Sequence, residues 1–348
     1  MKNELFKLID RLENEHSLTV REYRELIEGF DDSLSLYAAE KARKACKRHY
    51  GNDIYIRGLI EISNYCKNDC YYCGIRKSNA NCSRYRLSEE EILQCCAQGY
   101  DLGFRTFVLQ GGEDGHYTDS LLCGIISKIK SQYPDCAVTL SLGERSYESY
   151  KLLRHAGADR YLLRHETADE SHYKRLHPDD LSFENRKQCL KNLKEIGYQV
   201  GCGFMVGSPG QTSECLAKDL KFIQELSPHM CGIGPFIRHK DTPFKDEENG
   251  SVELTLFLLS LIRLIKPTIL LPATTALGTL SNDGRERGIL CGANVVMPNL
   301  SPASVREKYM LYEGKISTGQ ESAQCVSDLR QRMKAIGYDV VVAKGDAK

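Results

Sequence analysis

Short apolar runs alternate with helical segments along most of the chain, and this alternation constrains the fold more than any other sequence feature. Strands that alternate with helices pair in parallel through right-handed crossovers. The count of such runs predicts an α/β fold, a closed (β/α)8 barrel of the TIM type, with an open doubly wound sheet as the alternative. The predicted strands are 58–63, 106–111, 137–142, 160–165, 199–206, 231–236, 268–274 and 293–298.

Helical sequence precedes and follows the predicted barrel. Thr19 and Glu22 form a capping box, and Gly51 ends the amphipathic run 32–50. After Pro302 the pattern is again helical, and the last six residues, AKGDAK, are typical of disordered sequence. We therefore expect an N-terminal helical extension at 1–52, the barrel at 53–305 and a C-terminal helical tail at 306–348.

Charge and hydropathy exclude several classes of partner. The 348 residues include 47 Lys and Arg and 47 Asp and Glu, so no global field favours nucleic acid or an anionic membrane. The N-terminus lacks an apolar signal core, and the most apolar stretch, 254–265, contains Arg263 and is too short to span a bilayer. We expect a soluble cytoplasmic protein. The 15 cysteines suggest an anaerobic host, and most would be small buried hydrophobes.

Three cysteines are closely spaced directly after the first predicted strand, as Cys66, Cys70 and Cys73 in a Cx3Cx2C motif. A 4Fe–4S cluster normally has four cysteine ligands, so three thiolates would leave one iron open to another ligand. Zinc is the main competitor, but a structural zinc site needs four protein ligands, and no second pair lies close by. The odd cysteine count and the reducing compartment disfavour a disulfide. We predict one 4Fe–4S cluster on these three residues.

Polar residues follow the predicted strands, at the edge where barrels carry their chemistry. Thr139 and Ser141 share one face of their strand, and Arg164 and Glu166 share one face of theirs. If these faces point inward they form a polar chamber, because unpaired polar groups are not left in an apolar core. Such a chamber would take a small polar ligand. The alternative is that these residues pair with each other or face the helices near the rim.

The cysteine motif resembles that of the radical SAM superfamily, in which an aromatic residue, here Tyr72, precedes the third cysteine. The resemblance implies that the open iron binds the amino and carboxylate groups of S-adenosylmethionine (SAM). One electron from the cluster then cleaves the sulfonium and releases a 5′-deoxyadenosyl radical inside a water-poor barrel. Cys66, Cys70 and Cys73 would then be the catalytic centre as well as the metal ligands.

Further motifs of this family imply contacts with SAM. Gly111, Gly112 and Glu113 resemble the GGE motif that meets the SAM amino group, although Gly-Gly at a strand end is also a common turn. Glu166 matches a SAM-binding position at the end of the fourth strand. Arg186 would meet the SAM carboxylate. The alternative for both is an ion pair at the rim, which contributes little to stability.

A glycine-rich stretch at 203–212, which contains Met205, resembles the fifth-strand motif that closes on the adenosine of SAM. A tight strand-to-helix turn would explain its glycines equally well. The resemblance adds these residues to the predicted SAM site: Tyr72, Gln110, Ser141, Arg164, Met230 and Tyr309.

Within the superfamily the chain most resembles the HydE family of FeFe-hydrogenase maturases, through strings such as YLLRHET at 161–167, GIGPF at 232–236 and NVVMPN at 294–299. This implies assembly of the di-iron subcluster of the hydrogenase H-cluster from an iron–cysteine–carbonyl–cyanide synthon. Biotin synthase and methylornithine synthase share the barrel and the cysteine motif, so a radical SAM enzyme acting on an amino-acid-like substrate is the alternative. A third possibility is a non-catalytic iron–sulfur carrier. The chamber and the GGE-like motif count against it, because a carrier would need neither.

The same resemblance implies partners and a substrate cavity. The partners are a reductant such as ferredoxin or flavodoxin, and other hydrogenase maturases. For Met230 and Met297 the alternative is filling of the core. Tyr309 and Tyr312, expected three residues apart on a helix, would otherwise pack against the barrel mouth. The residues expected to line the cavity are Thr139, Ser141, Thr274, Thr275, Met297 and Tyr312.

Some HydE proteins carry an accessory iron–sulfur site on three cysteines near the C-terminus. Here the matching positions are Ser317, Cys325 and Asp328, so only one thiol remains. We therefore predict no second cluster.

Overall fold

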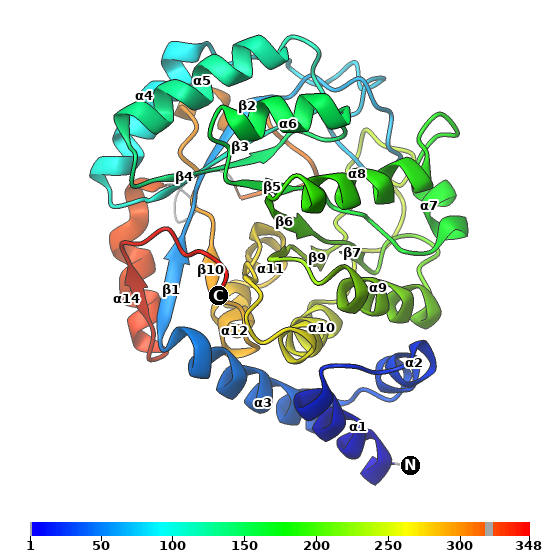
Figure 1. Cartoon of the computed structure of the whole chain (residues 1–348). Coiled ribbons are helices and arrows are strands. Elements are labelled where there is room, and N and C mark those ends of the chain that lie inside the picture. Colours follow the sequence, from blue (N-terminus) through cyan, green and yellow to red (C-terminus); the bar gives the residue numbers. More distant parts are fainter. Residues whose placement is uncertain (1, 317–322) are drawn as a thin grey trace.

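A ring of parallel strands forms the centre of the molecule, and helices surround it (Figure 1). The computed structural model describes residues 2–316 and 323–348. One sheet has the strand order β2-β3-β4-β5-β6-β8, with parallel pairing throughout. Its strands are β2 (Gly58–Ser63), β3 (Thr106–Gly111), β4 (Ala137–Ser141), β5 (Arg160–Leu162), β6 (Gln199–Cys202) and β8 (Met230–Cys231).

Single parallel bridges close this sheet into a barrel. Leu270 pairs with Met230 of β8, and Pro272 pairs with Val295 of β10 (Val295–Val296). The last connection in the ring is made by Leu59 of β2, whose N–H donates to the Pro298 carbonyl at 2.9 Å. The predicted (β/α)8 barrel is therefore confirmed, and the open sheet is not formed.

Two predicted strands are interrupted and one is reduced to bridges. The run 199–206 splits into β6 and β7 (Met205–Val206), and the run 231–236 splits into β8 and β9 (Gly234–Pro235). Between them Gly203 has a φ of +159°, and a Cβ there would lie 2.1 Å from the Gly232 carbonyl oxygen. In the run 268–274, Pro272 has no N–H to donate, so a regular ladder does not form.

The predicted helices begin and end close to their sequence signals. The capping boxes Thr19–Glu22 and Ser88–Glu91 are both formed, and Gly51 follows the helix that ends at Tyr50. The crossover helices are α4 (Glu89–Asp101), α5 (Asp119–Gln132), α6 (Tyr147–His155), α7 (Glu170–Leu176), α8 (Phe183–Glu195), α9 (Ser213–Leu226), α10 (Val252–Ile265), α11 (Thr275–Leu280) and α12 (Gly284–Leu290).

Three N-terminal helices lie beside the barrel and share its core. They are α1 (Lys2–Glu15), α2 (Val20–Glu28) and α3 (Asp32–Tyr50). Helix α2 packs on α9 and α3 on α10, which places the N-terminal segment at the bottom of Figure 1. One apolar cluster includes Ile9 and Leu34 of these helices together with Ile262 of α10. The division into three parts at residues 52 and 305 stays a prediction.

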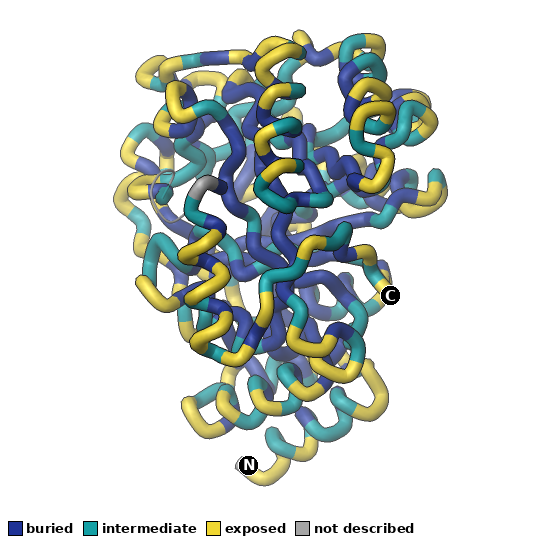
Figure 2. Tube along the Cα trace, turned by 90° about the vertical axis from the view of Figure 1, so that its left-hand side faces the viewer, coloured by how far each residue is buried: buried dark blue, intermediate teal, exposed yellow. Residues whose placement is uncertain are grey.

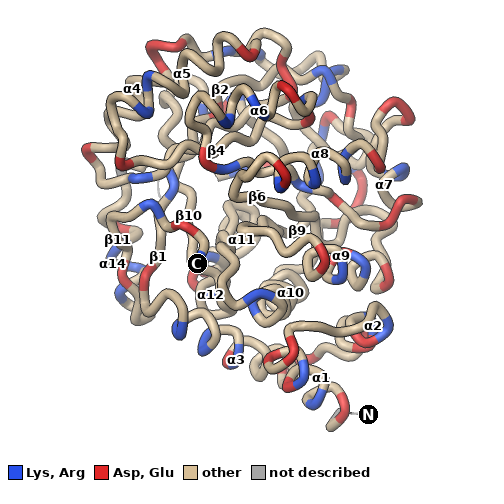
Figure 3. Tube along the Cα trace, viewed as in Figure 1, with Lys and Arg blue, Asp and Glu red and all other residues tan. Residues whose placement is uncertain are grey.

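Burial and charge separate the inside of the barrel from its surface. The strands are buried, whereas the outward faces of the helices are exposed (Figure 2). Acidic and basic residues are interspersed over the outer elements without one dominant sign, in keeping with the balanced composition (Figure 3). In the part of the chain that the structure describes, no helix combines the length and the apolar character that crossing a membrane requires.

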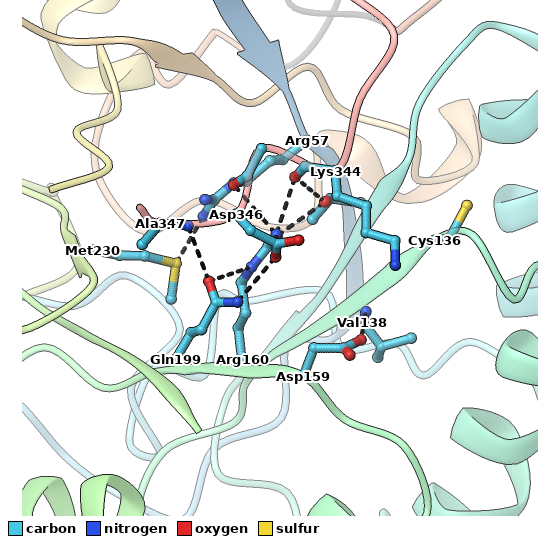
Figure 4. Close-up of polar contacts among 12 residues, drawn as sticks. Arg57, Cys136, Val138, Asp159, Arg160, Gln199, Met230, Lys344, Asp346 and Ala347 are labelled. Atoms are coloured by element: carbon cyan, nitrogen blue, oxygen red, sulfur yellow. Dashed lines mark hydrogen bonds and ion pairs between the residues drawn. The ribbon is translucent and has the colours of Figure 1, made fainter. Parts of the chain in front are cut away.

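The C-terminal segment differs from the helical, disordered-ending tail that the sequence predicts. After α13 (Ala303–Arg306), the 3-10 helix η2 (Ala323–Cys325) and α14 (Val326–Ala335), strand β11 (Asp339–Val341) pairs in parallel with β1 (Asp53–Ile56). Residues 344–347 then reach the barrel strands and meet Arg160 of β5 (Figure 4). The sequence AKGDAK is therefore placed by contacts with distant residues, which a local reading cannot detect.

Arg160 binds the end of the chain. Its guanidinium donates to the backbone carbonyls of Lys344 at 3.0 Å and Gly345 at 3.2 Å, and pairs with the Asp346 carboxylate at 2.6 Å. Gln199 donates to the same carboxylate at 2.9 Å. The Arg160 side chain is fully buried, so these acceptors replace the water that its N–H groups would otherwise bind.

Replacing Asp346 with asparagine is expected to lower the free energy of unfolding by about 1–2 kcal/mol, because the buried Arg160 guanidinium loses a charged acceptor and keeps the neutral ones. Urea unfolding of the two proteins measures this difference. The control is Asp339→Asn, which removes an exposed pair with Lys334 and should change the free energy by less than about 0.5 kcal/mol. Equal effects of the two substitutions would show that Arg160 does not need the carboxylate.

Candidate functional site

The three cysteines of the Cx3Cx2C motif lie in a long loop between β2 and α4, and internal hydrogen bonds fold this loop. Asn64 donates to the carbonyls of Ser83 at 2.8 Å and Lys308 at 2.7 Å. Arg84 donates to the carbonyls of Ile75 at 2.8 Å and Arg76 at 2.6 Å. A side chain from each end of the loop thus fixes the backbone around the cysteines.

The thiols of Cys66, Cys70 and Cys73 are free of disulfides and lie close enough to affect one another electrostatically. Burial raises the pKa of all three, and that of Cys73 reaches about 12, with the neighbouring Cys66 adding to the effect. Among the described residues, no three Cys, His, Asp or Glu side chains are gathered around a single-ion site. Three thiols in one loop, near enough to interact electrostatically, are the ligand type that an iron–sulfur cluster requires, so the donor set fits the predicted cluster.

The Gly-Gly-Glu motif at the end of β3 packs directly on this loop. A Cβ on Gly112 would lie 2.2 Å from the Tyr65 carbonyl oxygen and 2.8 Å from the Cβ of Cys66. The Lys67 N–H donates to the Glu113 carbonyl at 3.0 Å. Position 112 therefore needs a glycine because any side chain would collide with the cysteine loop. This close approach constrains the position more strongly than a turn alone would.

The Glu113 carboxylate is nearly buried and already binds an amine. It pairs with Lys67 Nζ at 3.0 Å and accepts the Glu144 N–H at 2.9 Å. Gly143 has a φ of +74°, and a Cβ there would lie 2.1 Å from the Glu113 Cγ. Glu113, Lys67 and Glu144 also line a cavity of about 410 Å³ at this rim of the barrel.

Glu166 follows β5 in a left-handed conformation, with a φ of +65° that is uncommon for any residue except glycine. Its N–H donates to the Gly203 carbonyl at 3.0 Å, and its carboxylate lies 3.4 Å from Arg164. Strain of this kind persists only where the surroundings enforce it, and it is concentrated at functional sites. Glu166 is also one of the residues that the sequence analysis assigns to SAM binding.

Arg186 of α8 reaches the same rim. Its Nε pairs with the Glu144 carboxylate and its Nη1 donates to the Arg164 carbonyl at 2.8 Å. Burial opposes the ionised form, but Tyr173, Glu144 and Tyr72 together raise the pKa of Arg186 well above its usual value. The guanidinium is therefore a permanent cation near the cysteine loop.

Aromatic and sulfur-containing side chains cover the other side of the loop. Tyr72 packs with Met205 in a small apolar cluster, and its hydroxyl lies 3.3 Å from His177 Nε2. Gln110 of β3 donates to the Tyr309 hydroxyl at 3.4 Å. Tyr309 is buried, and burial together with Glu61 and the nearby cysteines raises its pKa. The structure therefore brings Tyr72, Met205, Gln110 and Tyr309 to the barrel mouth.

Several inward-facing polar atoms at the upper end of the barrel are buried and have no hydrogen-bond partner within the described part of the chain. They are Thr139 Oγ1, Arg164 Nε and Nη2, Glu166 Oε2 and Thr274 Oγ1. Two of them, Arg164 Nη2 and Glu166 Oε2, lie 3.4 Å apart as an ion pair, so this part of the expected chamber pairs with itself. Native proteins rarely leave such atoms unsatisfied, so each needs an explanation. A polar ligand inside the barrel would supply the missing partners. Ser141 pairs in register with Gln110, next to these atoms.

Met230 and Met297 are not brought to the cysteine loop. They lie in a separate apolar cluster with Tyr55 and Val295, and Arg57 Nη1 donates to the Met230 sulfur at 2.8 Å. Thr275 begins α11 and accepts from Arg285 at 3.4 Å. Tyr312 is half-buried in an irregular segment, so neither it nor Tyr309 lies on the expected helix.

The sequence analysis misses two features of the site. Glu61, fully buried in β2, pairs with Lys315 and accepts from Asn299 at 3.0 Å. The signal for it is a single carboxylate inside an otherwise apolar strand. His165 pairs with Asp219 of α9 at 3.2 Å, behind the strand ends. Nothing in the local sequence connects these two residues, which are far apart along the chain.

The chain is similar to proteins of known family over most of its length. A family model described as the radical SAM superfamily matches residues 60–223, from the first barrel strand to α9. The [FeFe] hydrogenase maturase subunit HydE of Thermotoga maritima is 45% identical over 309 residues, covering 89% of this chain and 87% of that protein. This chain belongs to the radical SAM superfamily, in the family of HydE. It is therefore a radical SAM enzyme, and the family uses a 4Fe–4S cluster and SAM.

Other relatives share this radical SAM fold. A 3-methylornithine synthase of Methanosarcina acetivorans is 28% identical over 330 residues, covering 90% of this chain and 92% of that protein. The crystal structure of methylornithine synthase (PylB) superposes with a TM-score of 0.84 at 25% identity, covering 96% and 97% of the two chains. The hydrogenase maturase HydG superposes with a TM-score of 0.81 at 21% identity, over 97% of this chain and 76% of that one, which shows the fold alone.

Proposed function

We propose that this radical SAM enzyme acts in maturation of FeFe hydrogenase, building the di-iron subcluster of the H-cluster from a small iron–cysteine–carbonyl–cyanide synthon. The single observation that carries the proposal is the set of three cysteine thiols at the mouth of a closed barrel that holds unpartnered polar atoms. The 45% identity to a protein named as an [FeFe] hydrogenase maturase subunit supports the role in maturation.

Cys66, Cys70 and Cys73 would hold one 4Fe–4S cluster, and Glu113, Glu166 and Arg186 would bind SAM. When reduced, the bound cluster would supply one electron to the SAM sulfonium, whose C5′–S bond would break to give methionine and a 5′-deoxyadenosyl radical. Glu113 presents a nearly buried carboxylate to an amine, and Arg186 presents a cation to a carboxylate. Tyr72 and Met205 exclude water from one side of the site through their apolar contacts.

The substrate would lie in the upper barrel, among the inward-facing polar side chains. Thr139 and Thr274 offer hydroxyls that lack hydrogen-bond partners among the residues described here, and Arg164 offers a guanidinium whose ion pair with Glu166 is 3.4 Å long. Ser141, Thr275 and Tyr312 would complete the lining. These groups suit a small polar or anionic ligand better than an apolar one. The partners would be a reductant such as ferredoxin or flavodoxin and other hydrogenase maturases.

A second candidate is a radical SAM enzyme acting on an amino-acid-like substrate. The observation that favours it is the close superposition on methylornithine synthase, at a TM-score of 0.84 over nearly the whole chain. Turnover assays separate the two candidates. The cluster-loaded enzyme with SAM and a reductant is expected to consume the iron synthon and to leave lysine unchanged, and conversion of lysine would instead support the second candidate.

Replacing Glu166 with glutamine is expected to weaken SAM binding by about tenfold, because one charged hydrogen-bond acceptor is lost at constant size. Anaerobic calorimetry on the cluster-loaded protein measures the dissociation constant. Iron content should stay at the wild-type level, since Glu166 is not a ligand of the cluster. Unchanged SAM affinity would remove Glu166 from the proposed site.

Replacing Cys325 with alanine is expected to leave the iron content unaltered, because the protein would carry no second cluster. Cys325 ends η2 and Asp328 lies in α14, whereas Ser317 lies outside the described residues. Iron and sulfide analysis after anaerobic reconstitution measures the effect. Loss of iron in this variant would show that the C-terminal region binds metal.

A further inference from the structure

A buried histidine and a buried aspartate meet directly behind Glu166. His165 precedes Glu166 in the segment after β5, and Asp219 lies in α9. The imidazole Nε2 and the carboxylate Oδ1 are 3.2 Å apart, and the two side chains are 1% and 0% exposed. The proposed chemistry uses neither group.

The hydrogen bonds around this pair fix its protons. The Gly203 N–H donates to His165 Nδ1 at 3.3 Å, so Nδ1 is an acceptor and the proton of the neutral ring is on Nε2. This Nε2–H donates to Asp219 Oδ1, and the Ala168 N–H donates to the same oxygen. The other oxygen, Asp219 Oδ2, is buried and has no hydrogen-bond partner in the described parts of the chain.

The surroundings favour uncharged forms of both residues. The His165 ring lies between Phe204 and Phe222, with ring centroids 5.8 and 4.7 Å away. Burial lowers the pKa of His165 to about 3 and raises the pKa of Asp219 well above its usual range. An ionised carboxylate with one oxygen unpartnered in such a place would be costly.

The pair is connected to Glu166 on both sides. Gly203, which donates to His165, also accepts the Glu166 N–H through its carbonyl at 3.0 Å. Ala168, two residues after Glu166, donates to Asp219. Asp219 therefore binds the His165 side chain before, and the Ala168 backbone after, the residue whose φ is +65°. An unfavourable backbone conformation persists only when contacts of this kind enforce it.

We propose that His165 and Asp219 are positioning residues, a neutral hydrogen-bonded pair that keeps Glu166 in the left-handed conformation in which it meets SAM. The pair does not touch SAM and acts through the 165–168 backbone. This inference rests on the proposed function in one respect, the contact between Glu166 and SAM.

Asp219→Asn and Asp219→Ala test the pair together. The Oδ1 of asparagine still accepts hydrogen bonds from Ala168 and His165. Its NH2 group stands where Asp219 Oδ2 is in the wild-type protein. Asp219→Asn should therefore bind SAM within about twofold of wild type. Alanine removes the shared acceptor and should weaken SAM binding by about tenfold with unchanged iron content. His165→Phe keeps the ring packing and removes both hydrogen bonds of the imidazole, so it should behave like Asp219→Ala. It replaces Asp219→Ala in the test if that variant fails to fold.

Hydrogen–deuterium exchange of the peptide covering residues 160–170, measured on the reconstituted protein without SAM, gives a second readout. Exchange should accelerate about tenfold in Asp219→Ala and His165→Phe but stay near wild type in Asp219→Asn. If asparagine is as damaging as alanine, the pair is charged and the inference is wrong. Wild-type exchange and SAM affinity in both Asp219→Ala and His165→Phe would also overturn it. If exchange responds as expected while wild-type protein fails to bind SAM, the proposed function fails and the structural role of the pair stands.

Discussion

Cys70→Ala is expected to abolish formation of 5′-deoxyadenosine and to leave the reconstituted protein without its cluster. Removal of an outer-shell partner of a metal site typically costs 10–100-fold in affinity or activity, and loss of one of the three proposed protein ligands should cost more than about 100-fold. Iron and sulfide content and the amount of 5′-deoxyadenosine per enzyme measure both effects. Cys66→Ala and Cys73→Ala should give the same result.

Cys82→Ala is the matched control for these variants. Cys82 lies in the same loop, where its sulfur accepts a hydrogen bond from Asn64 at 3.5 Å. Its loss should leave iron content and SAM cleavage within about twofold of wild type, since it is not a predicted ligand. Cluster loss in Cys82→Ala, or activity retained in Cys70→Ala, would contradict the ligand assignment.

Lys315→Met is expected to lower the free energy of unfolding by about 3–5 kcal/mol, the cost of leaving a buried charge without its partner. Lys315 binds Glu61 of β2 and donates to the Tyr309 carbonyl at 2.9 Å, and the two charged side chains are 6% and 0% exposed. Without the ammonium, the Glu61 carboxylate keeps, among the described residues, the Asn299 amide at 3.0 Å. Urea unfolding of the apo-protein measures the loss.

Two further variants make this test specific. Lys334→Met removes an exposed pair with Asp339 and should change the free energy by less than about 1 kcal/mol. The double variant Glu61→Gln/Lys315→Met leaves no unpaired charge, so it should recover a large part of the stability. A small effect of Lys315→Met alone would show that the Glu61 carboxylate is hydrated or neutral.

The barrel could be predicted from the sequence because its signals are local. Apolar runs of strand length alternate with helices, and caps such as Thr19 and Ser88 mark helix starts within one turn. The cysteine spacing is local as well, which is why the loop after β2 is identifiable as a candidate metal site. Pro272 shows the limit of this approach, because an apolar run of the right length lacks a donor and forms only bridges.

The remaining features depend on contacts between residues that are distant in sequence. Arg160 binds backbone carbonyls of 344 and 345, and a carbonyl acceptor has no side-chain signature in the sequence. Lys315 and Glu61 are 254 residues apart, and His165 and Asp219 are 54 apart. The left-handed conformation of Glu166 is equally invisible, because it is imposed by neighbours and not by the residue type.

Electron paramagnetic resonance of the anaerobically reconstituted, reduced enzyme, recorded with and without SAM, tests the central claim most directly. A cluster bound only by Cys66, Cys70 and Cys73 has an iron accessible to the cofactor, so its spectrum should change when SAM is added. A spectrum that SAM leaves unaltered, or a purified protein that contains zinc in place of iron, would contradict the account.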